Sequence, residues 1–351
     1  MSPDFILKGE RTMELWDGYN ADGTLAGVDI AREDERQGRF PEGLYHLVVD
    51  VIVRHVDGTY LAMQRDHNKI GFPGAWEIGA GGSVLKGESA YDGALRELRE
   101  ETGVIAEKLI HLGKMTVLCD NGVGVHYHVY FCVTDMDKDA ITLQQGETID
   151  FKWINSDEIL NGEYIPQRSL DFVRRLHSSE YIATERLLLR PIAETDLTTA
   201  HRYASDKELT RYMLNLPNDT EEETLKFITD AVAEWNKAQP EYYEYAVTLD
   251  GYQIGGVCLY LTEDRKQGEL GWVLNPDYHG KGYAFEAAKA MIGLAEHLGL
   301  QAVFARCDSR NKPSEALMKR LGLTLESDNG TRFYDKRGEI AGELKYSKSL
   351  R

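Results

Sequence analysis

The sequence predicts two mixed domains of the α+β or α/β class, joined end to end. The chain has 351 residues, more than one ordinary domain needs and about right for two. Helical and strand-like segments alternate along its whole length, and a short polar segment interrupts them near the middle. We therefore expect a first domain over residues 1–177, a linker over 178–183 and a second domain over 184–351.

The first of these domains is predicted from short runs rich in β-branched and aromatic residues, bounded by turn formers. One long helical pattern covers 89–102, and a shorter one covers 170–177. The expected strands are 45–54, 60–65, 115–118, 126–133 and 149–154.

The second domain begins with a fresh strand and then alternates in a different order. The expected strands are 186–192, 243–249, 253–261, 269–274 and 302–307, followed by a final strand pair. The expected helices are 193–205, 220–238, 284–298 and 313–321.

The charge balance excludes one broad class of partner. The chain has 40 Lys plus Arg against 58 Asp plus Glu, so its formal net charge is −18. A surplus of negative charge is repelled by nucleic-acid backbones and anionic membranes. We expect neither a nucleic-acid polymer nor a membrane as partner, whereas a nucleotide bound through a metal ion or a local cluster stays possible.

Cysteine usage and the chain's beginning favour a cytoplasmic location. The four cysteines are scattered, form no CxxC pair and predict neither a zinc site nor a disulfide framework. No run of about 18 apolar residues could span a bilayer. The first residues lack the basic and apolar regions of a secretion signal.

Three carboxylates in the long helix of the first domain form the most informative pattern. Glu97, Glu100 and Glu101 are spaced i, i+3 and i+4, so they share one helix face and repel one another. Converging carboxylates beside glycine-rich backbone form an all-oxygen site of the kind that Mg²⁺ or Mn²⁺ prefers. Taken by itself, such a face is more often a solvated Glu-rich surface.

The spacing around these carboxylates favours the metal site. Residues 82–104 fit the pattern G-x5-E-x7-R-E-U-x-E-E-x-G-U, where U is a bulky aliphatic residue, at every defined position. In this respect the segment resembles the Nudix superfamily, whose members hydrolyse a diphosphate linkage in a nucleoside diphosphate bonded to another moiety. The matching residues are Gly82, Glu88, Arg96, Glu97, Leu98, Glu100, Glu101, Gly103 and Val104.

The resemblance implies a Nudix α/β/α sandwich with a mixed sheet. It implies that the catalytic divalent metals, Mg²⁺ or Mn²⁺, are ligated by Glu97, Glu100, Glu101 and the Gly82 carbonyl. Arg96 would orient the acidic cluster through charge-assisted hydrogen bonds, and Glu88 would support the loop before the helix.

Other residues of the first domain are weaker candidates. In relatives an acid often lies in the loop before a Trp-containing strand, where this chain has Glu147, a candidate base or additional metal ligand. Arg65 and Lys69 could meet the substrate's phosphates, or they could be ordinary surface charges. His126 and His128 lie at strand spacing without a third ligand, so we expect them to pack rather than bind zinc.

Flanking sequence narrows the subgroup. Residues 14–17, 45–46, 64–65, 69 and 73–76 resemble the Nudix branch closest to isopentenyl-diphosphate isomerase. That isomerase needs a cysteine and a metal-binding histidine shortly after the tryptophan, and neither follows Trp76. We therefore expect hydrolase chemistry. The intact signature also argues against a nucleotide sensor that binds without cleaving.

A glycine-bearing turn between a strand and a helix marks the second domain. Residues 269–276 read as a strand, and 277–284 (DYHGKGYA) lead into a helix whose N-terminus favours anions. The spacing fits neither a nucleoside-triphosphatase phosphate loop nor a dinucleotide fingerprint. It resembles the acetyl-CoA pyrophosphate loop Q/R-x-x-G-x-G/A of GNAT acyltransferases, with Gly282 and Ala284 matching and His279 in the Gln/Arg position.

Further stretches resemble the RimL-like branch of that family: 184–191, 254–256, 270–276, 279–287 and 307–323. The resemblance implies a GNAT mixed sheet flanked by helices. It implies acetyl-CoA as co-substrate, its pyrophosphate cradled by the backbone amides of Gly280, Lys281, Gly282, Tyr283 and Ala284.

The resemblance also gives roles to single side chains. Asn311 would bind the pantetheine arm, and Ser314 would approach the thioester or a cofactor phosphate. An amine must lose a proton before it attacks, and Glu269 on the strand leading to the loop is the candidate base. Met318 stands where many GNAT enzymes carry a thiolate-protonating tyrosine.

Together these patterns predict a bifunctional enzyme. The first domain would hydrolyse a small-molecule diphosphate, and the second would acetylate an amine, on a small molecule or a protein N-terminus. The alternative is an active hydrolase whose second domain only binds acetyl-CoA or mediates oligomerisation. A homodimer is possible because GNAT-type domains often pair.

Overall fold

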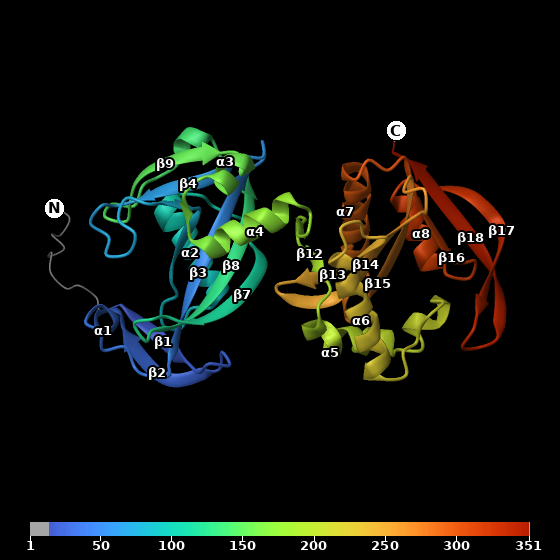
Figure 1. The fold of residues 1–351 in the computed structure, drawn as a ribbon, viewed down its shortest axis with the longest axis horizontal. Coiled ribbons are helices and arrows are strands. Elements are labelled where there is room, and N and C mark those ends of the chain that lie inside the picture. Colours follow the sequence, from blue (N-terminus) through green and yellow to red (C-terminus); the bar gives the residue numbers. More distant parts are fainter. Residues whose placement is uncertain (1–13, 351) are drawn as a thin grey trace, which may run out of the picture. The chain divides into compact units, whose positions relative to one another are not determined.

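The computed structural model describes residues 14–350. The N-terminal residues on which the expected lack of a secretion signal rests lie mostly outside this range. The chain forms two compact units, the first ending at Arg174 and the second beginning at Arg175 (Figure 1). No helix among the described residues is long and apolar enough to cross a membrane.

Among the described residues of the first unit, ten strands form one mixed sheet. Its centre is β3 (Tyr45–His55), which pairs in parallel with β8 (Gly124–Thr134) along its whole length. The other strands are β1 (Leu15–Tyr19), β2 (Leu25–Ala31), β4 (Tyr60–Arg65), β5 (Trp76–Ile78), β6 (Ala80–Ser83), β7 (Ile110–Leu118), β9 (Thr148–Ile154) and β10 (Tyr164–Ile165).

Helix α2 (Ala90–Thr102) lies against this sheet and places the acidic face. It begins where the Ser89 hydroxyl accepts a hydrogen bond from the Asp92 N–H at 3.1 Å. Buried Ala94 and Leu98 pack into the core formed by the valines of β3. Glu101 lies three residues after Leu98, so it borders this packing face and is itself buried, whereas Glu100 is exposed. Shorter helices are α1 (Arg32–Arg36), α3 (Ser156–Asn161) and α4 (Gln167–His177), whose last three residues lie beyond the end of this unit.

The structure differs from the expected elements mainly in short strands. Strands β1, β2, β5, β6 and β10 were not expected, and β7 begins five residues before the predicted 115. Its pairing with β8 shifts register between His111 and Gly113. A Cβ on Gly113 would lie 3.0 Å from the Phe172 ring, so the glycine that weakens the strand pattern admits a close packing contact.

Within the described part of the second unit, eight strands form one sheet in the order β11-β12-β13-β14-β15-β16-β18-β17. Strands β15 (Gln267–Leu274) and β16 (Ala302–Asp308) pair in parallel, and their pairing stops after Glu269 and Phe304. The two strands therefore diverge halfway along the sheet. The remaining strands are β11 (Ile182–Ala183), β12 (Leu188–Pro191), β13 (Tyr242–Leu249), β14 (Tyr252–Leu261), β17 (Thr324–Tyr334) and β18 (Glu339–Ser349).

Helices cover both faces of the second sheet (Figure 1). Helices α5 (Leu197–Ala204) and α6 (Glu221–Trp235) pack on Ala246 and Val273, whereas α7 (Tyr283–His297) packs on the residues that alternate with them. Helix α8 (Lys312–Arg320) follows β16. The short 3₁₀ turns are Lys138–Ala140, Glu194–Asp196, Leu209–Tyr212 and Pro276–Tyr278.

Two boundaries of the second unit differ from expectation. The helix predicted from 193 begins at Leu197, because the Asp196 carboxylate turns back to accept hydrogen bonds from Arg190 and the Ala193 N–H. The segment expected as a linker joins the second unit, since Tyr245 Oη donates to the Ser179 carbonyl at 2.7 Å and β11 pairs with β12.

Candidate active sites

The first unit contains a cavity of about 1110 Å³ above the acidic face of α2. It is lined by side chains from α2, from the glycine-rich strand β6 and from the loops at 65–72 and 144–147. The sequence-predicted residues that line it are Arg65, Lys69, Gly82, Arg96, Glu97, Glu100, Glu101 and Glu147. Residues up to 82 positions apart in the sequence are thus gathered around one space.

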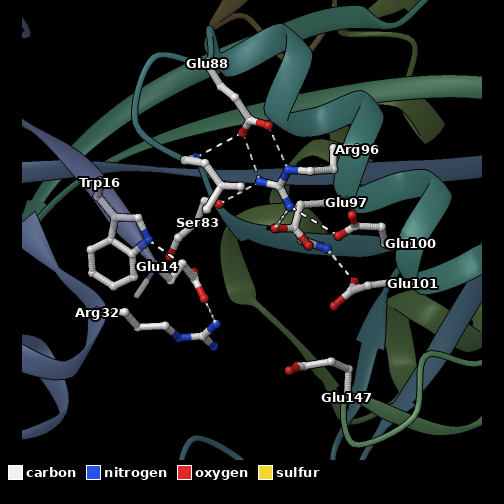
Figure 2. Close-up of polar contacts among 12 residues, drawn as sticks. Glu14, Trp16, Arg32, Ser83, Glu88, Arg96, Glu97, Glu100, Glu101 and Glu147 are labelled. Carbon is white, nitrogen blue, oxygen red and sulfur yellow. Dashed lines mark hydrogen bonds and ion pairs between the residues drawn. The ribbon is translucent and has the colours of Figure 1, made fainter. Parts of the chain in front are cut away.

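Arg96 is the centre of a hydrogen-bond network around the acidic face (Figure 2). Its guanidinium donates to both carboxylate oxygens of Glu88, at 2.9 and 3.0 Å, and to the Ser83 carbonyl at 3.0 Å. Another nitrogen of the same group donates to Glu97 Oε1 at 2.7 Å and Glu100 Oε2 at 3.3 Å. Arg96 therefore fixes the loop before α2 and offsets the repulsion between neighbouring carboxylates.

Glu101 is the most deeply buried acid of the cluster. Its Oε2 accepts a hydrogen bond from the Gly81 N–H at 2.9 Å. Burial raises the pKa of the Glu101 carboxyl well above its ordinary value, and the negative charges of Glu77 and Glu97 raise it further. Such a group is costly as a lone anion and becomes favourable beside a cation.

The backbone at Gly82 lies directly against Glu97. A Cβ on Gly82 would lie 2.4 Å from Glu97 Oε1, so a side chain at this position would displace the Glu97 carboxylate. Because Gly82 has no side chain, the backbone of β6 lies close to the carboxylates. A carbonyl oxygen of this backbone can therefore bind the same cation as they do.

The chemistry of these donors fits a hard divalent cation, although no preformed cluster is present. Among residues 14–350, no three Asp, Glu, His or Cys side chains are grouped closely enough to hold a metal ion. Two of the carboxylates instead turn to Arg96. The buried, mutually repelling glutamates and the glycine cradle nevertheless supply an all-oxygen set of the type that Mg²⁺ and Mn²⁺ take.

Two further ion pairs border the cluster. Lys69 forms an ion pair with Glu147, and Arg65 Nη1 binds Glu77 Oε2 at 2.8 Å. Burial and the neighbouring Arg65 charge lower the pKa of Lys69. Glu147 thus lines the cavity from the loop before β9. Its partner Lys69 carries a charge that could also bind a phosphate group.

The second unit contains a cavity of about 1080 Å³ at the point where β15 and β16 diverge. The residues predicted from the sequence that line it are Gly280, Gly282, Tyr283, Ala284, Asn311 and Ser314. Lys281 belongs to the same turn, and Glu269 is not among the lining residues.

The glycine turn is fixed by contacts with the beginning of the unit. Gly280 and Gly282 have φ values of +75° and +84°, a backbone conformation that glycine adopts without strain, and α7 begins directly after them. Arg186 donates to the Lys281 carbonyl at 2.9 Å and to Glu286 Oε2 at 2.7 Å. His279 Nε2 lies 2.9 Å from the Leu274 carbonyl, which accounts for a histidine at this position.

Three other side chains named from the sequence differ in their surroundings. Asn311 caps α8 by accepting a hydrogen bond from the Ser314 N–H at 3.2 Å. Met318 is fully buried in the core. Glu269 is held by Arg306, whose Nε donates to Glu269 Oε1 at 3.0 Å.

Comparison with known proteins identifies both units. Residues 44–176 match the family model of the NUDIX domain, and residues 186–324 match that of the acetyltransferase (GNAT) domain. An uncharacterised Nudix hydrolase of Listeria monocytogenes is 30% identical over 158 residues, 44% of this chain and 89% of that protein. The uncharacterised N-acetyltransferase YnaD of Bacillus subtilis is 31% identical over 150 residues, 42% of this chain and 84% of that protein. The chain joins a Nudix domain to a GNAT acetyltransferase domain.

A solved GNAT acetyltransferase of Bacillus anthracis is 27% identical and covers 48% of this chain and 98% of its own, with a TM-score of 0.43. The predicted membership of both families is confirmed, as are the mixed α/β fold of each domain and the assignment of both domains to enzyme families. A GNAT domain further implies acetyl-CoA as its ligand.

Several residues of the Nudix cavity escaped prediction from the sequence. Glu77 on β5 influences Glu101 through its charge, and the buried Asp50 of β3 receives two hydrogen bonds from Arg168 of α4. Arg168 also lies over the Tyr127 ring, 3.7 Å from its centroid. The alternation of β5 after the tryptophan could have indicated Glu77, whereas a partner 118 positions away could not be found by spacing.

His126 and His128 contact neighbouring side chains within the sheet. His126 is 2.8 Å from the Thr116 hydroxyl and stacks on Tyr45. His128 is 3.2 Å from His111, and burial lowers the pKa of both imidazoles to about 4.

Proposed function

We propose that the Nudix domain catalyses the Mg²⁺- or Mn²⁺-dependent hydrolysis of a small-molecule diphosphate, such as a nucleoside diphosphate linked to another group. The observation that carries the proposal is the gathering of Glu97, Glu100 and Glu101 around one cavity that also contains Arg65 and Lys69. Carboxylates suit the metal, and cationic side chains suit phosphate oxygens.

In this proposal the ligands of the metal are Glu97, Glu100, Glu101 and the Gly82 carbonyl. A bound divalent ion polarises the diphosphate and favours deprotonation of the attacking water. Arg96 keeps the carboxylates oriented, and Glu101 is both ligand and catalytic residue. Glu147, released from Lys69 when that lysine meets a phosphate, is the base that accepts the water's proton.

The test is a screen of the intact chain against nucleoside-diphosphate derivatives with Mg²⁺ or Mn²⁺. Glu100→Gln and Glu101→Gln keep the side-chain volume and remove a charge, so hydrolysis should fall by roughly 100-fold or more while the fold survives. Near-normal hydrolysis by both variants would overturn the metal assignment.

We propose that the GNAT domain transfers the acetyl group of acetyl-CoA to an amine, on a small molecule or a protein N-terminus. The glycine turn and the start of α7 offer five backbone amides, Gly280 to Ala284, to the pyrophosphate. Asn311 would bind the pantetheine arm. Ser314 at the cavity would protonate the leaving thiolate, since Met318 is sequestered in the core.

The buried Met318 also favours a second candidate, a GNAT domain that binds acetyl-CoA or mediates oligomerisation without transferring acetyl groups. Turnover of acetyl-CoA with a panel of amines separates the two candidates. Gly282→Trp is the control, because its side chain would occupy the place of the cofactor at the glycine turn. Binding of acetyl-CoA without turnover of any amine would favour the binding module. The cytoplasmic location and the homodimer stay predictions.

A further inference from the structure

Glu244 on β13 is a carboxylate of the GNAT cavity for which the sequence patterns gave no role. Glu244 pairs with Cys258 on β14, and Cys258 pairs in turn with Gly271 on β15. Residues paired in this way point to the same face, here the face covered by α5 and α6. In the row formed by Glu244, Cys258 and Gly271, the side chains become smaller toward the gap between β15 and β16. The Glu244 carboxylate therefore lines the cavity.

Small side chains along the row are required rather than incidental. A Cβ on Gly271 would lie 2.5 Å from Cys258 Sγ, so that position cannot carry a larger residue without displacement. Strands in a sheet lie about 4.8 Å apart, so the row leaves room for an acceptor nitrogen between Glu244 and the divergence of the strands. The same cavity reaches the glycine turn and Ser314.

The carboxylate of Glu244 has only neutral partners. Tyr260 Oη donates to its Oε1 at 2.7 Å, and the Cys258 thiol hydrogen-bonds the same group. The charge of Glu244 raises the pKa of Tyr203 on α5 and of Tyr242 on β13, after the larger effect of their burial, while Trp235 of α6 donates to the Glu244 backbone carbonyl. Burial without a neighbouring cation raises the pKa of Glu244 to about 7.

Other acids near the cavity are already engaged. Glu269 is held by Arg306, Glu208 forms an ion pair with Arg211, and Asp206 accepts hydrogen bonds from two backbone N–H groups. The same cavity is lined by apolar side chains from the segment between α5 and α6 and from α6 itself: Leu209, Met213, Leu214, Leu216 and Phe227.

We propose that Glu244 binds the ammonium group of the acceptor and takes its proton, and that the acceptor is a cationic primary amine on an apolar stem. This proposal rests on the proposed acetyl transfer. One proton of the ammonium moves to the carboxylate, and the neutral nitrogen then forms a bond to the acetyl carbon. The carbon–sulfur bond breaks, the nitrogen loses its second proton, and the thiolate is protonated. The proton held by Glu244 returns to solvent, so one proton is released per turnover.

The binding arm of the test uses n-hexylammonium and its neutral analogue 1-hexanol as probes, titrated into the intact chain by calorimetry at pH 8. Glu244→Gln should weaken n-hexylammonium binding by about 10-fold or more and leave 1-hexanol unchanged. Glu296→Gln removes an equal charge from an exposed position on α7 and should change neither affinity. Equal n-hexylammonium affinities in wild type and Glu244→Gln would overturn the proposal.

The kinetic arm measures acetyl-CoA turnover with the best amine of the panel. The wild-type kcat/KM should fall below about pH 7, as Glu244 becomes protonated, whereas Glu244→Gln should lose about 100-fold and lack this limb. Glu244→Asp keeps the charge, so its kcat/KM should be lower than that of the wild type but should still fall at low pH. This second variant keeps the test valid if Glu244→Gln does not fold.

Three outcomes separate the two claims. An unchanged pH profile in Glu244→Gln, or a larger loss in Glu269→Gln, would overturn the role of Glu244 and leave acetyl transfer intact. A wild type that turns over no amine, but still binds n-hexylammonium through Glu244, would overturn the proposed transfer and leave the ammonium site.

Discussion

At the scale of single residues, the acidic face of the Nudix domain depends on one planar cation. Arg96 reaches Glu88, Ser83, Glu97 and Glu100 because a guanidinium offers five donors in a fixed plane. A lysine carries the same charge as a point and cannot serve these partners together. The geometry of this network, beyond its charge, should therefore matter for catalysis.

Arg96→Lys tests this dependence. The substitution keeps the positive charge and removes the paired hydrogen bonds, so metal-dependent hydrolysis should fall by about 10- to 100-fold. Arg99→Lys on the exposed side of the same helix is the matched control and should keep full activity. Equal activity in the two variants would show that charge alone suffices.

The residues that could be predicted from the sequence are those whose partners lie nearby along the chain. Glu97, Glu100 and Glu101 follow from helical spacing, and Gly282 follows from a turn before a helix. Glu244 could not be predicted, because its environment depends on how three strands align and on the space left beside them. Burial of a single acid leaves no periodic signal.

At the scale of elements, α2 is fixed at both ends, and its predicted bounds, 89–102, differ from the observed ones by one residue. The Ser89 cap and the left-handed Gly103 are local signals, which explains this accuracy. Short strands such as β5, β6 and β10 have no such signal, because they are set by pairing with distant strands.

Gly103→Ala should destabilise the chain more than Gly87→Ala. Both glycines have positive φ, +74° and +82°, so an alanine costs about 1–2 kcal/mol at either position. A Cβ on Gly103 would also lie 2.1 Å from Thr142 Oγ1, whereas nothing lies within 4 Å at Gly87. Calorimetric unfolding of the intact chain measures the difference, and equal unfolding temperatures would contradict the steric part of this argument.

At the scale of the whole molecule, each unit has its own core and its own cavity, for which we propose a phosphate-bearing ligand. In the proposed functions, the Nudix domain uses carboxylates suited to a metal ion, and the GNAT domain uses backbone amides at a helix start. The formal charge of −18 disfavours polyanions as bulk partners and is compatible with nucleotides as ligands. Part of that charge lies on the acidic face of α2, where the proposed divalent cation would offset it.

The two activities should be separable by mutation. Glu101→Gln should abolish hydrolysis and leave the affinity for acetyl-CoA within about 2-fold, because the two cavities belong to separate units that share no lining residue. Gly282→Trp should abolish acetyl-CoA binding and leave hydrolysis unchanged. Calorimetric titration with acetyl-CoA and a hydrolysis assay on both variants measure this, and loss of both functions in either variant would indicate that the domains depend on one another.

Titration of the intact chain with Mn²⁺, followed by the electron paramagnetic resonance signal of the free ion, tests the central claim most directly. The wild type should bind Mn²⁺ through the acidic face of α2, and Glu101→Gln should weaken that binding by roughly 10-fold or more, while the exposed Glu296→Gln should not change it. Indistinguishable Mn²⁺ binding by wild type and Glu101→Gln would contradict a metal site on this helix.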